Sequence, residues 1–234
     1  MPYGFLDIAI TPSVKAAQEA NGVAALWSDF KGSRTFDRFT EAEAAFIAER
    51  DSFYMATVSE TGWPYVQHRG GPKGLLRVLD DRTLAFADFR GNLQYLSVGN
   101  LAADNRASLI LMDYAARRRL KIFARIEVKD LKDNPELAEA VATPGYRGKP
   151  ERAMLLHLEA FDWNCPQFIT PRFTETEIAQ ALAPVNQRIE ELEAENKRLS
   201  EKLAKAKADG DEPARAALRR AVERSAVRAT RIAE

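Results

Sequence analysis

The residues that could do chemistry gather first at a corner, "FADFRGN" (residues 86–92), where an apolar run ends and a helix-like stretch, "LQYLSVGNL", begins. The first backbone N–H groups of a helix lack partners, and the helix dipole favours an anion there. Gly91 would let the backbone approach a ligand closely, and Asn92 could cap the helix. The corner therefore predicts a seat for a phosphate group, although Asn92 could equally be no more than a cap.

Basic residues in other expected strands could supply the charge that a phosphate needs. Arg69 ends the run "YVQHR", and Lys73 follows in the next loop. The stretch "RRRLKIFARI" carries Arg118, and its period-two alternation sends Arg119 and Lys121 to one face. We expect these cations to converge on the corner; taken singly, Arg118 and Lys121 could also be solvated strand charges.

The usual catalytic templates are missing. The only histidines, His68 and His157, lie in separate expected strands and have no metal-ligand spacing around them. There is no GxGxxG, and "GGPKG" does not have the spacing of a GxxxxGK[ST] phosphate loop. We therefore expect no metal site, assign no catalytic residue, and find no motif for a hydrolase.

Composition narrows the class of protein. The chain has 234 residues, with 34 basic and 34 acidic side chains, and this balance argues against a general nucleic-acid-binding protein. The single cysteine, Cys165, cannot form an internal disulfide. No signal-peptide pattern and no apolar run of about 20 residues is visible, so we expect a soluble cytoplasmic protein without membrane contact.

The chain divides into three regions by its patterns. Residues 1–39 read as a helical and loop extension, in which Thr11-Pro12 marks a helix start. Thr40 and Glu43 have the spacing of a capping box. Residues 40–173 then hold short strands with turn signals between them and one helix at about 93–104. Such a series favours a small antiparallel barrel over a parallel sheet. The strand-like runs are "FYMATV", "YVQHR", "LLRVL", "TLAFAD", "SLILMD", "RLKIFARIEV" and "AMLLHLEAF".

Residues 174–234 form a helical region with a coiled-coil pattern at about 184–207. Its apolar seam places Asn196 at an a position, which favours two parallel strands in fixed register. Pro184 predicts a break between a short helix and a long one. A single helix packed on its own barrel is the alternative, and the tail from Asp211 could fold back as a hairpin or fray. The seam residues are Ile178, Leu182, Val185, Ile189, Leu192, Asn196, Leu199 and Leu203.

Several stretches together resemble the pyridoxamine 5'-phosphate oxidase-like family of FMN-binding split-barrel proteins, in particular its subgroup of uncharacterised bacterial flavin-nucleotide-binding proteins. They are "FYMATVSETGWPYVQHRGGP", "LRVLDDRTLAFADFRGNLQYLSVGNLAADNRASLILMDY", "RRRLKIFARIEV" and "FDWNCPQFITPRFT". The likeness covers about residues 40–175. It implies a six-stranded antiparallel split β-barrel that forms a homodimer with FMN at the subunit interface.

The resemblance also implies which residues hold the cofactor. The phosphate would lie against the second strand and the corner, and the "RRRLK" strand and the segment at 163–167 would approach the flavin, the latter from the other subunit. Two positions depart from the subgroup's pattern, because Leu93 and Phe168 stand where arginine and histidine are usual. The implied FMN-binding residues are Arg69, Lys73, Ala87, Asp88, Gly91, Asn92, Gln94, Arg118, Arg119, Lys121, Trp163, Asn164 and Gln167.

The leading hypothesis is an FMN-dependent oxidoreductase that transfers a hydride to flavin N5, with the protein supplying position and electrostatics. The alternative is a non-catalytic flavin or small-anion binding module whose coiled coil serves assembly. Neither hypothesis names the substrate, since specificity in such proteins would depend on the shape of the pocket.

Overall fold

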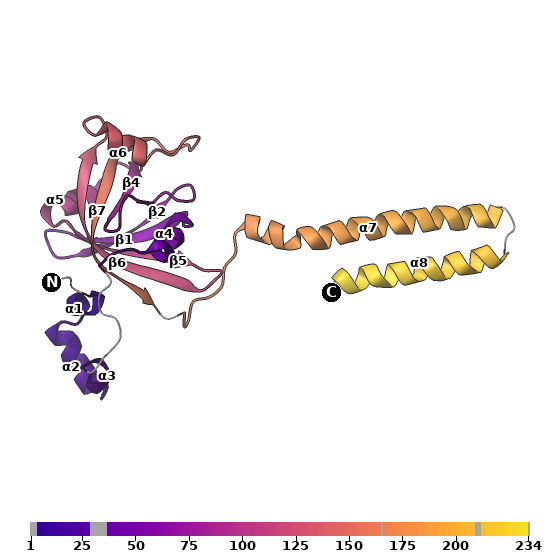
Figure 1. Ribbon diagram of the computed structural model, residues 1–234, viewed down its shortest axis with the longest axis horizontal. Helices are drawn as coiled ribbons and strands as arrows, with labels where there is room; N and C mark the ends of the chain where they lie inside the picture. Colours follow the sequence, from indigo (N-terminus) through magenta and orange to yellow (C-terminus); the bar gives the residue numbers. More distant parts are fainter. Residues whose placement is uncertain (1–3, 29–36, 165, 209–211, 234) are drawn as a thin grey trace. The chain divides into compact units, whose positions relative to one another are not determined.

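The computed structural model describes residues 4–28, 37–164, 166–208 and 212–233, and the side chains of residues 164, 214, 215 and 225–233 lie outside that description (Figure 1). Two compact units divide the chain, one from Met1 to Pro171 and one from Arg172 to Glu234. The helices of the first unit are α1 (Phe5–Ala9), α2 (Pro12–Ala20), α3 (Ala24–Ser28), α4 (Glu41–Ala48), α5 (Leu96–Ala103) and α6 (Pro135–Ala140).

The first unit is built on one antiparallel sheet of the split-barrel type. It has seven described strands in the order β2-β1-β5-β6-β7-β4-β3, where the resemblance implied six. The expected strand at 75–79 shrinks to the two residues of β3, because Leu75 and Leu76 turn into the core instead of continuing the ladder. The strands are β1 (Ser52–Val58), β2 (Pro64–Gly70), β3 (Arg77–Val78), β4 (Thr83–Phe89), β5 (Arg106–Asp113), β6 (Arg118–Asp130) and β7 (Pro150–Asn164).

Alternation along the strands sets the inner and outer faces of the sheet. In β6, Leu120 and Ile122 are fully buried, whereas Arg119 and Lys121 point to the other face, as the period-two pattern predicted. The core joins β1, β4, β5, β6 and β7 to α4 and α5 through side chains such as Phe53, Leu101 and Leu156. This core fixes the strand ends that surround the corner.

Two helix starts expected in the first 50 residues are present. The Thr11 side chain accepts a hydrogen bond from the backbone N–H of Val14 at the start of α2. At the start of α4, Thr40 and Glu43 form the expected capping box. Side-chain oxygens thus satisfy N–H groups that have no partner inside either helix.

The helix after the corner begins later than the sequence predicted. It was expected from about residue 93, but α5 begins at Leu96, and Leu93 and Tyr95 both have left-handed backbone conformations, with φ of 66° and 52°. Two left-handed residues interrupt any helix that would start at Asn92. Asn92 is therefore not the helix cap, and this part of the prediction was wrong.

The second unit consists of α7 (Glu175–Ala208) and α8 (Glu212–Ala233), and α8 packs along α7 (Figure 1). The predicted break at Pro184 is absent, because α7 runs through this residue without interruption. Loss of one backbone hydrogen bond is tolerated at this exposed position of a 34-residue helix. No described helix is long and apolar enough to cross a membrane.

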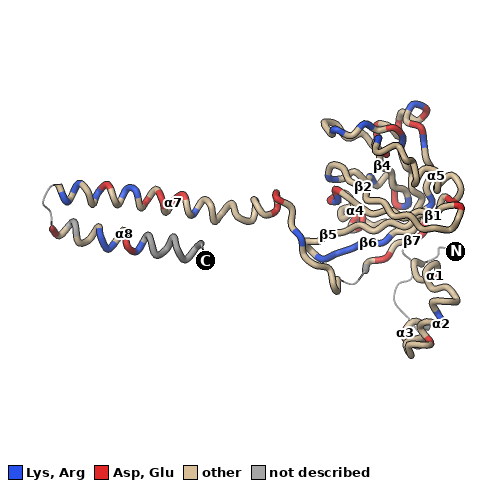
Figure 2. Tube along the Cα trace, turned by 180° about the vertical axis from the view of Figure 1, so that it is seen from behind, with Lys and Arg blue, Asp and Glu red and all other residues tan. Residues whose placement is uncertain are grey.

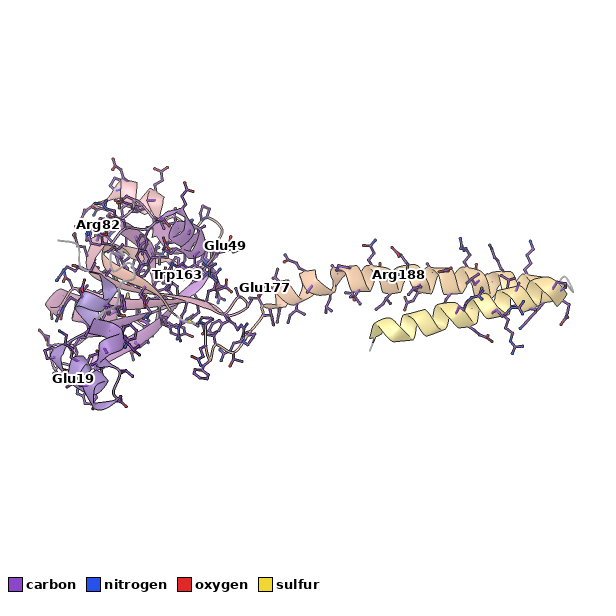
Figure 3. The ribbon with its side chains drawn as sticks, turned by 60° about the horizontal axis from the view of Figure 1, so that its bottom comes forward. Glu19, Glu49, Arg82, Trp163, Glu177 and Arg188 are labelled. Carbon is purple, nitrogen blue, oxygen red and sulfur yellow. The ribbon has the colours of Figure 1, made fainter. Side chains whose placement is uncertain are left out.

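From Val185 onward, the residues of the predicted seam are buried or half-buried on α7, the helix along which α8 packs. Leu192 is buried, whereas Ile178 and Leu182, near the start of α7, are about half exposed. Arg188, which Figure 3 labels on α7, contacts Glu191 of the same helix at 2.8 Å. The tail thus adopts the hairpin alternative, and pairing with a second chain stays a prediction.

Candidate flavin site

The corner after β4 lines a pocket of about 230 Å³, here called the corner pocket. Strand β2 contributes one wall, with Gln67 and Arg69 pointing to the inner face of the sheet, and the loop after β4 contributes another. Five residues expected at the FMN site line this pocket, so the fold brings this part of the prediction together. They are Arg69, Asp88, Gly91, Asn92 and Gln94.

A chain of ion pairs runs along the floor of the corner pocket. The Asp88 carboxylate is almost fully buried and contacts Arg69 Nη1 at 2.5 Å and Arg152 Nη1 at 3.1 Å. Arg152 also contacts Glu151 at 3.0 Å, and Arg90 lies 3.7 Å from the same carboxylate. Three guanidinium groups and two carboxylates leave one net positive charge, which is fixed in place because each partner is held by another.

The pairing of β4 with β7 explains how Arg152 reaches this network of ion pairs. Strand β4 pairs antiparallel with β7 in a register that sets Asp88 opposite Arg152. Neighbouring side chains of a pair on one face lie within reach of each other. The register cannot be read from either strand alone, which is why sequence reasoning missed Arg152.

The loop of the corner pocket is organised by its amide side chains and not by a helix start. Asn92 Oδ1 accepts a hydrogen bond from the backbone N–H of Gln94 at 3.2 Å, and the two side chains also bond to each other. A Cβ at Gly91 would meet no atom within 4 Å, so the backbone is open to the pocket. Leu93 is half exposed and also lines it.

A second cavity of about 490 Å³ shares Gln67, Arg69, Phe89 and Gly91 with the corner pocket. We call it the loop pocket, because residues 146–149 of the loop before β7 form one of its walls. Ala87, which was expected at the FMN site, lines this cavity. The arginine and lysine residues that line it are Arg69, Arg90, Arg147 and Lys149, of which sequence reasoning had assigned only the first, and His68 lines it as well.

The remaining cations do not converge on the corner within one chain. Lys73 lies in neither pocket and pairs with Glu49 at 2.5 Å. Arg118, half-buried Arg119 and Lys121 lie at the start of β6, where Figure 2 shows a concentration of Lys and Arg. Lys121 contacts Asp162 of β7 at 2.7 Å.

Trp163 lies at the same end of the sheet and is part of the core boundary (Figure 3). Its indole N–H donates to Glu43 at 2.7 Å, and the Arg118 guanidinium lies 4.7 Å from its ring centroid. About 11 residues of β7 separate Trp163 from Arg152, which corresponds to roughly 35 Å of extended strand.

Four further residues noted in the sequence lie near the end of the first unit. Gln167 is exposed and lies in neither pocket, and Phe168 is 93% exposed. The side chain of Asn164 and the whole of Cys165 lie outside the described residues. No cluster of three or more potential metal ligands occurs among the residues that the structure describes.

The first unit is thus an antiparallel β protein of the split-barrel type, with a pocket lined by Arg69 at the corner after β4. The family model for pyridoxamine 5'-phosphate oxidase matches residues 39–157, which is 119 of the 234 residues. The chain therefore belongs to the pyridoxamine 5'-phosphate oxidase family, as the resemblance indicated.

Solved structures of several proteins are similar to the first unit. A putative pyridoxamine 5'-phosphate oxidase from Lactobacillus delbrueckii is 20% identical, with a TM-score of 0.41, and the match covers 54% of this chain and 94% of that one. An FMN-binding protein from Syntrophomonas wolfei is 12% identical, with a TM-score of 0.38 and coverage of 52% and 83%. A FAD-binding protein from Mesorhizobium loti is 13% identical, with a TM-score of 0.38 and coverage of 54% and 94%. No curated protein matches the chain significantly.

Proposed function

We propose that this protein is an FMN-binding oxidoreductase of the pyridoxamine 5'-phosphate oxidase type. Membership of the family over residues 39–157 carries the proposal, because the matched region contains both pockets at the corner. The residues that gather there are arginines, amides and open backbone, which are groups that bind a phosphorylated, polar and planar cofactor.

A buried hydrogen-bond donor at the corner pocket indicates that its residues fit the phosphate of a flavin. Arg69 Nε is buried and has no hydrogen-bond partner among the described residues, although Nη1 of the same side chain is bound to Asp88. A buried donor without a partner is costly, and a bound anion would satisfy it. Arg69 would hold the phosphate, with Asn92 and Gln94 as neutral donors beside it.

Bound FMN would supply hydride acceptance at N5, and the protein would supply position and charge. The buried pair of Asp88 and Arg69 fixes the direction of the guanidinium before a ligand arrives, so little ordering is needed on binding. The ring of Phe89 lines both pockets and would offer an apolar surface to a bound cofactor. No side chain is assigned a proton-transfer role.

The proposal includes a homodimer. Within one chain, Arg118, Trp163 and Gln167 lie away from both pockets, so they could approach a flavin only from a second subunit. The outer face of β1 and β2 carries exposed apolar side chains, including Tyr54 and Val66, which suits burial against another copy. Sedimentation at several protein concentrations would measure this association.

A non-catalytic flavin or small-anion binding module is the second candidate. It is favoured by the ion-pairing of all three charged residues that line the corner pocket, Arg69, Asp88 and Glu151. Charges held in this way suit binding more than proton transfer. The long hairpin of α7 and α8 would then serve assembly.

Absorbance of the purified protein tests both candidates. An enzyme should be yellow, or become yellow on reconstitution with FMN, and its flavin bands should bleach with NAD(P)H or an amine substrate. Bleaching by dithionite alone would favour the binding module. A colourless protein that does not take up FMN would contradict both flavin functions.

Substitution at the corner pocket locates the cofactor. Arg69→Gln should weaken FMN binding by about tenfold or more, because a charge-assisted bond to phosphate is worth about 1.5–3 kcal/mol. Lys15→Gln removes an exposed cation of α2, outside both pockets, and should change the affinity less than twofold. Equal effects of the two substitutions would place the flavin elsewhere.

A further inference from the structure

The hairpin of α7 and α8 buries little of its own apolar seam. Leu192 is the one buried side chain of α7, a helix that the structure describes throughout. The other seam residues from Val185 to Leu203 are half-buried, and so are Leu218 and Val222 of α8. Two helices alone enclose no core, whereas four helices can surround one. The apolar face of the hairpin is therefore only partly covered within its own unit.

The first turns of α7 extend past the end of α8. The two helices have 34 and 22 residues, and α8 returns from the far end of α7 (Figure 1). The difference of 12 residues corresponds to about 18 Å of helix. Ile178 and Leu182 lie on this stretch, one turn apart, and are 48% and 47% exposed. They continue the seam of α7 beyond the part that α8 can cover.

The two halves of α7 carry opposite charge. Residues 175–195 contain six glutamates and one arginine, whereas residues 196–208 contain one glutamate and five lysines and arginines. All of these charged side chains are exposed. Arg219 and Arg220 of α8 add to the basic half, because α8 starts at that end of the hairpin. An antiparallel pair of hairpins sets each acidic half against a basic half, whereas a parallel pair sets like charges together.

Asn196 stands at the boundary between the two halves of α7. Its side-chain Oδ1 is buried and has no hydrogen-bond partner among the residues that the structure describes. A buried acceptor without a donor is costly. In an antiparallel pair related by a two-fold axis, residues next to the axis meet their own copies. An axis at the boundary of the two halves would bring the Nδ2 donor of a second Asn196 to this acceptor.

We propose that the hairpins of two chains pack antiparallel as a four-helix bundle. The basic end of the second hairpin covers Ile178 and Leu182, and its own Asn196 supplies the missing donor. Because α7 is about 51 Å long, the first units of the two chains are attached at opposite ends of the bundle. Chains paired in this way belong to two different copies of the proposed homodimer, so the bundle joins those dimers. The joining rests on the proposed homodimer, whereas the bundle itself does not depend on flavin binding.

Light scattering of the full chain and of residues 1–171 tests this association. The core of the truncated chain contains no residue of the hairpin. The full chain should contain at least twice as many subunits as the truncated chain, which means four against two where the proposed homodimer forms. Equal numbers would overturn the inference, because the seam would then be covered by the first unit of its own chain or by another protein. A full chain that pairs but binds no flavin would contradict the proposed function and leave the bundle standing.

Charge reversal assigns the association to the two halves of α7. The substitutions K202E/K205E bring glutamates opposite the acidic half, and E190K/E193K bring lysines opposite the basic half. All four side chains are exposed, so the helical circular dichroism signal should be unchanged. Sedimentation at several concentrations should show association weakened by about tenfold or more in each variant, and restored in an equimolar mixture of the two. K202R/K205R keeps the charge and should change it less than twofold. A mixture that does not restore association would overturn the inference.

Distances between spin labels test the direction of packing. The labels are attached to introduced cysteines after Cys165→Ser removes the single native cysteine. A label at Ala208→Cys, at the end of α7, should lie about 30–40 Å from its copy in an antiparallel pair and within about 15 Å in a parallel one. A label at Ser200→Cys, close to Asn196, is the control and should lie near its copy in either arrangement. A short distance between the labels at position 208 would overturn the antiparallel bundle.

Discussion

Leu93 lies where one added cation would most change the corner pocket. Its side chain is 49% exposed and lines the pocket, and the net charge of the ion-pair network beneath it is only +1. We predict that Leu93→Arg tightens FMN binding by about tenfold, because a guanidinium can bind phosphate in a bidentate way. Leu93→Gln, measured in the same fluorescence titration, should change the affinity less than twofold. A tenfold gain in both would attribute the effect to polarity and not to charge.

Glu43 joins a helix start to the core, so its charge should affect stability. Its carboxylate accepts hydrogen bonds from Thr40 Oγ1 at 2.5 Å and from Trp163 Nε1 at 2.7 Å. Burial raises its pKa, but the hydrogen bonds from Thr40 and Trp163 outweigh burial, and the net pKa lies below the ordinary value of 4.5. We predict that Glu43→Ala lowers the free energy of unfolding by about 1–2 kcal/mol at pH 7.

The pH dependence of this contribution follows from the lowered pKa. The stabilisation by Glu43 is complete above the unfolded-state pKa and is lost as pH falls through the lower folded-state value. The difference in stability between wild type and Glu43→Ala should therefore shrink below about pH 4.5, as measured by urea unfolding at several pH values. Glu41→Ala, at an exposed position of the same helix turn, is the control. A difference that stays constant down to pH 3 would contradict this role.

At the scale of elements, the sequence correctly predicted the strands and helix starts that depend on a local pattern of residues. Alternation located the long strands, and side-chain spacing located the starts of α2 and α4. The sequence pattern did not predict the start of α5. Leu93 and Tyr95 have left-handed backbone there, a conformation that leucine and tyrosine usually avoid and that their residue types therefore do not indicate. Sequence reasoning also missed the loop pocket, since the charges of Arg147 and Lys149 matter only once Gly148 seats the loop against Phe89.

Pro184 is the residue that most weakens α7. The helix continues through it, so the missing backbone donor and the clash of the ring with the preceding turn are tolerated at a cost of about 3 kcal/mol relative to alanine. We predict that Pro184→Ala raises the melting temperature of the hairpin and the helical circular dichroism signal. Ala183→Gly should act in the opposite direction by about 1 kcal/mol. A lower melting temperature for Pro184→Ala would show that the proline is needed for packing in this helix.

At the scale of the whole molecule, the candidate site belongs to one of the two compact units. Every described residue that lines the corner and loop pockets lies between Tyr65 and Glu151, within the unit that ends at Pro171. The resemblance predicted the family, and six of the thirteen residues that it implied line one of the two pockets. Prediction could not extend to Arg152 or to the separation of Arg118 from the corner, because both follow from the register and length of β7.

A chain truncated after Pro171 should keep its fold and its ligands. The core of the first unit contains no residue of α7 or α8, so removal of the hairpin exposes none of that core. We predict that residues 1–171 melt cooperatively and bind FMN within twofold of the full chain. Light scattering should show the proposed dimer in the truncated chain, because the expected interface residues around Trp163 are retained. If the truncated chain is monomeric while the full chain is dimeric, dimer formation depends on the hairpin. If the truncated chain also loses FMN binding, the flavin site depends on that dimer.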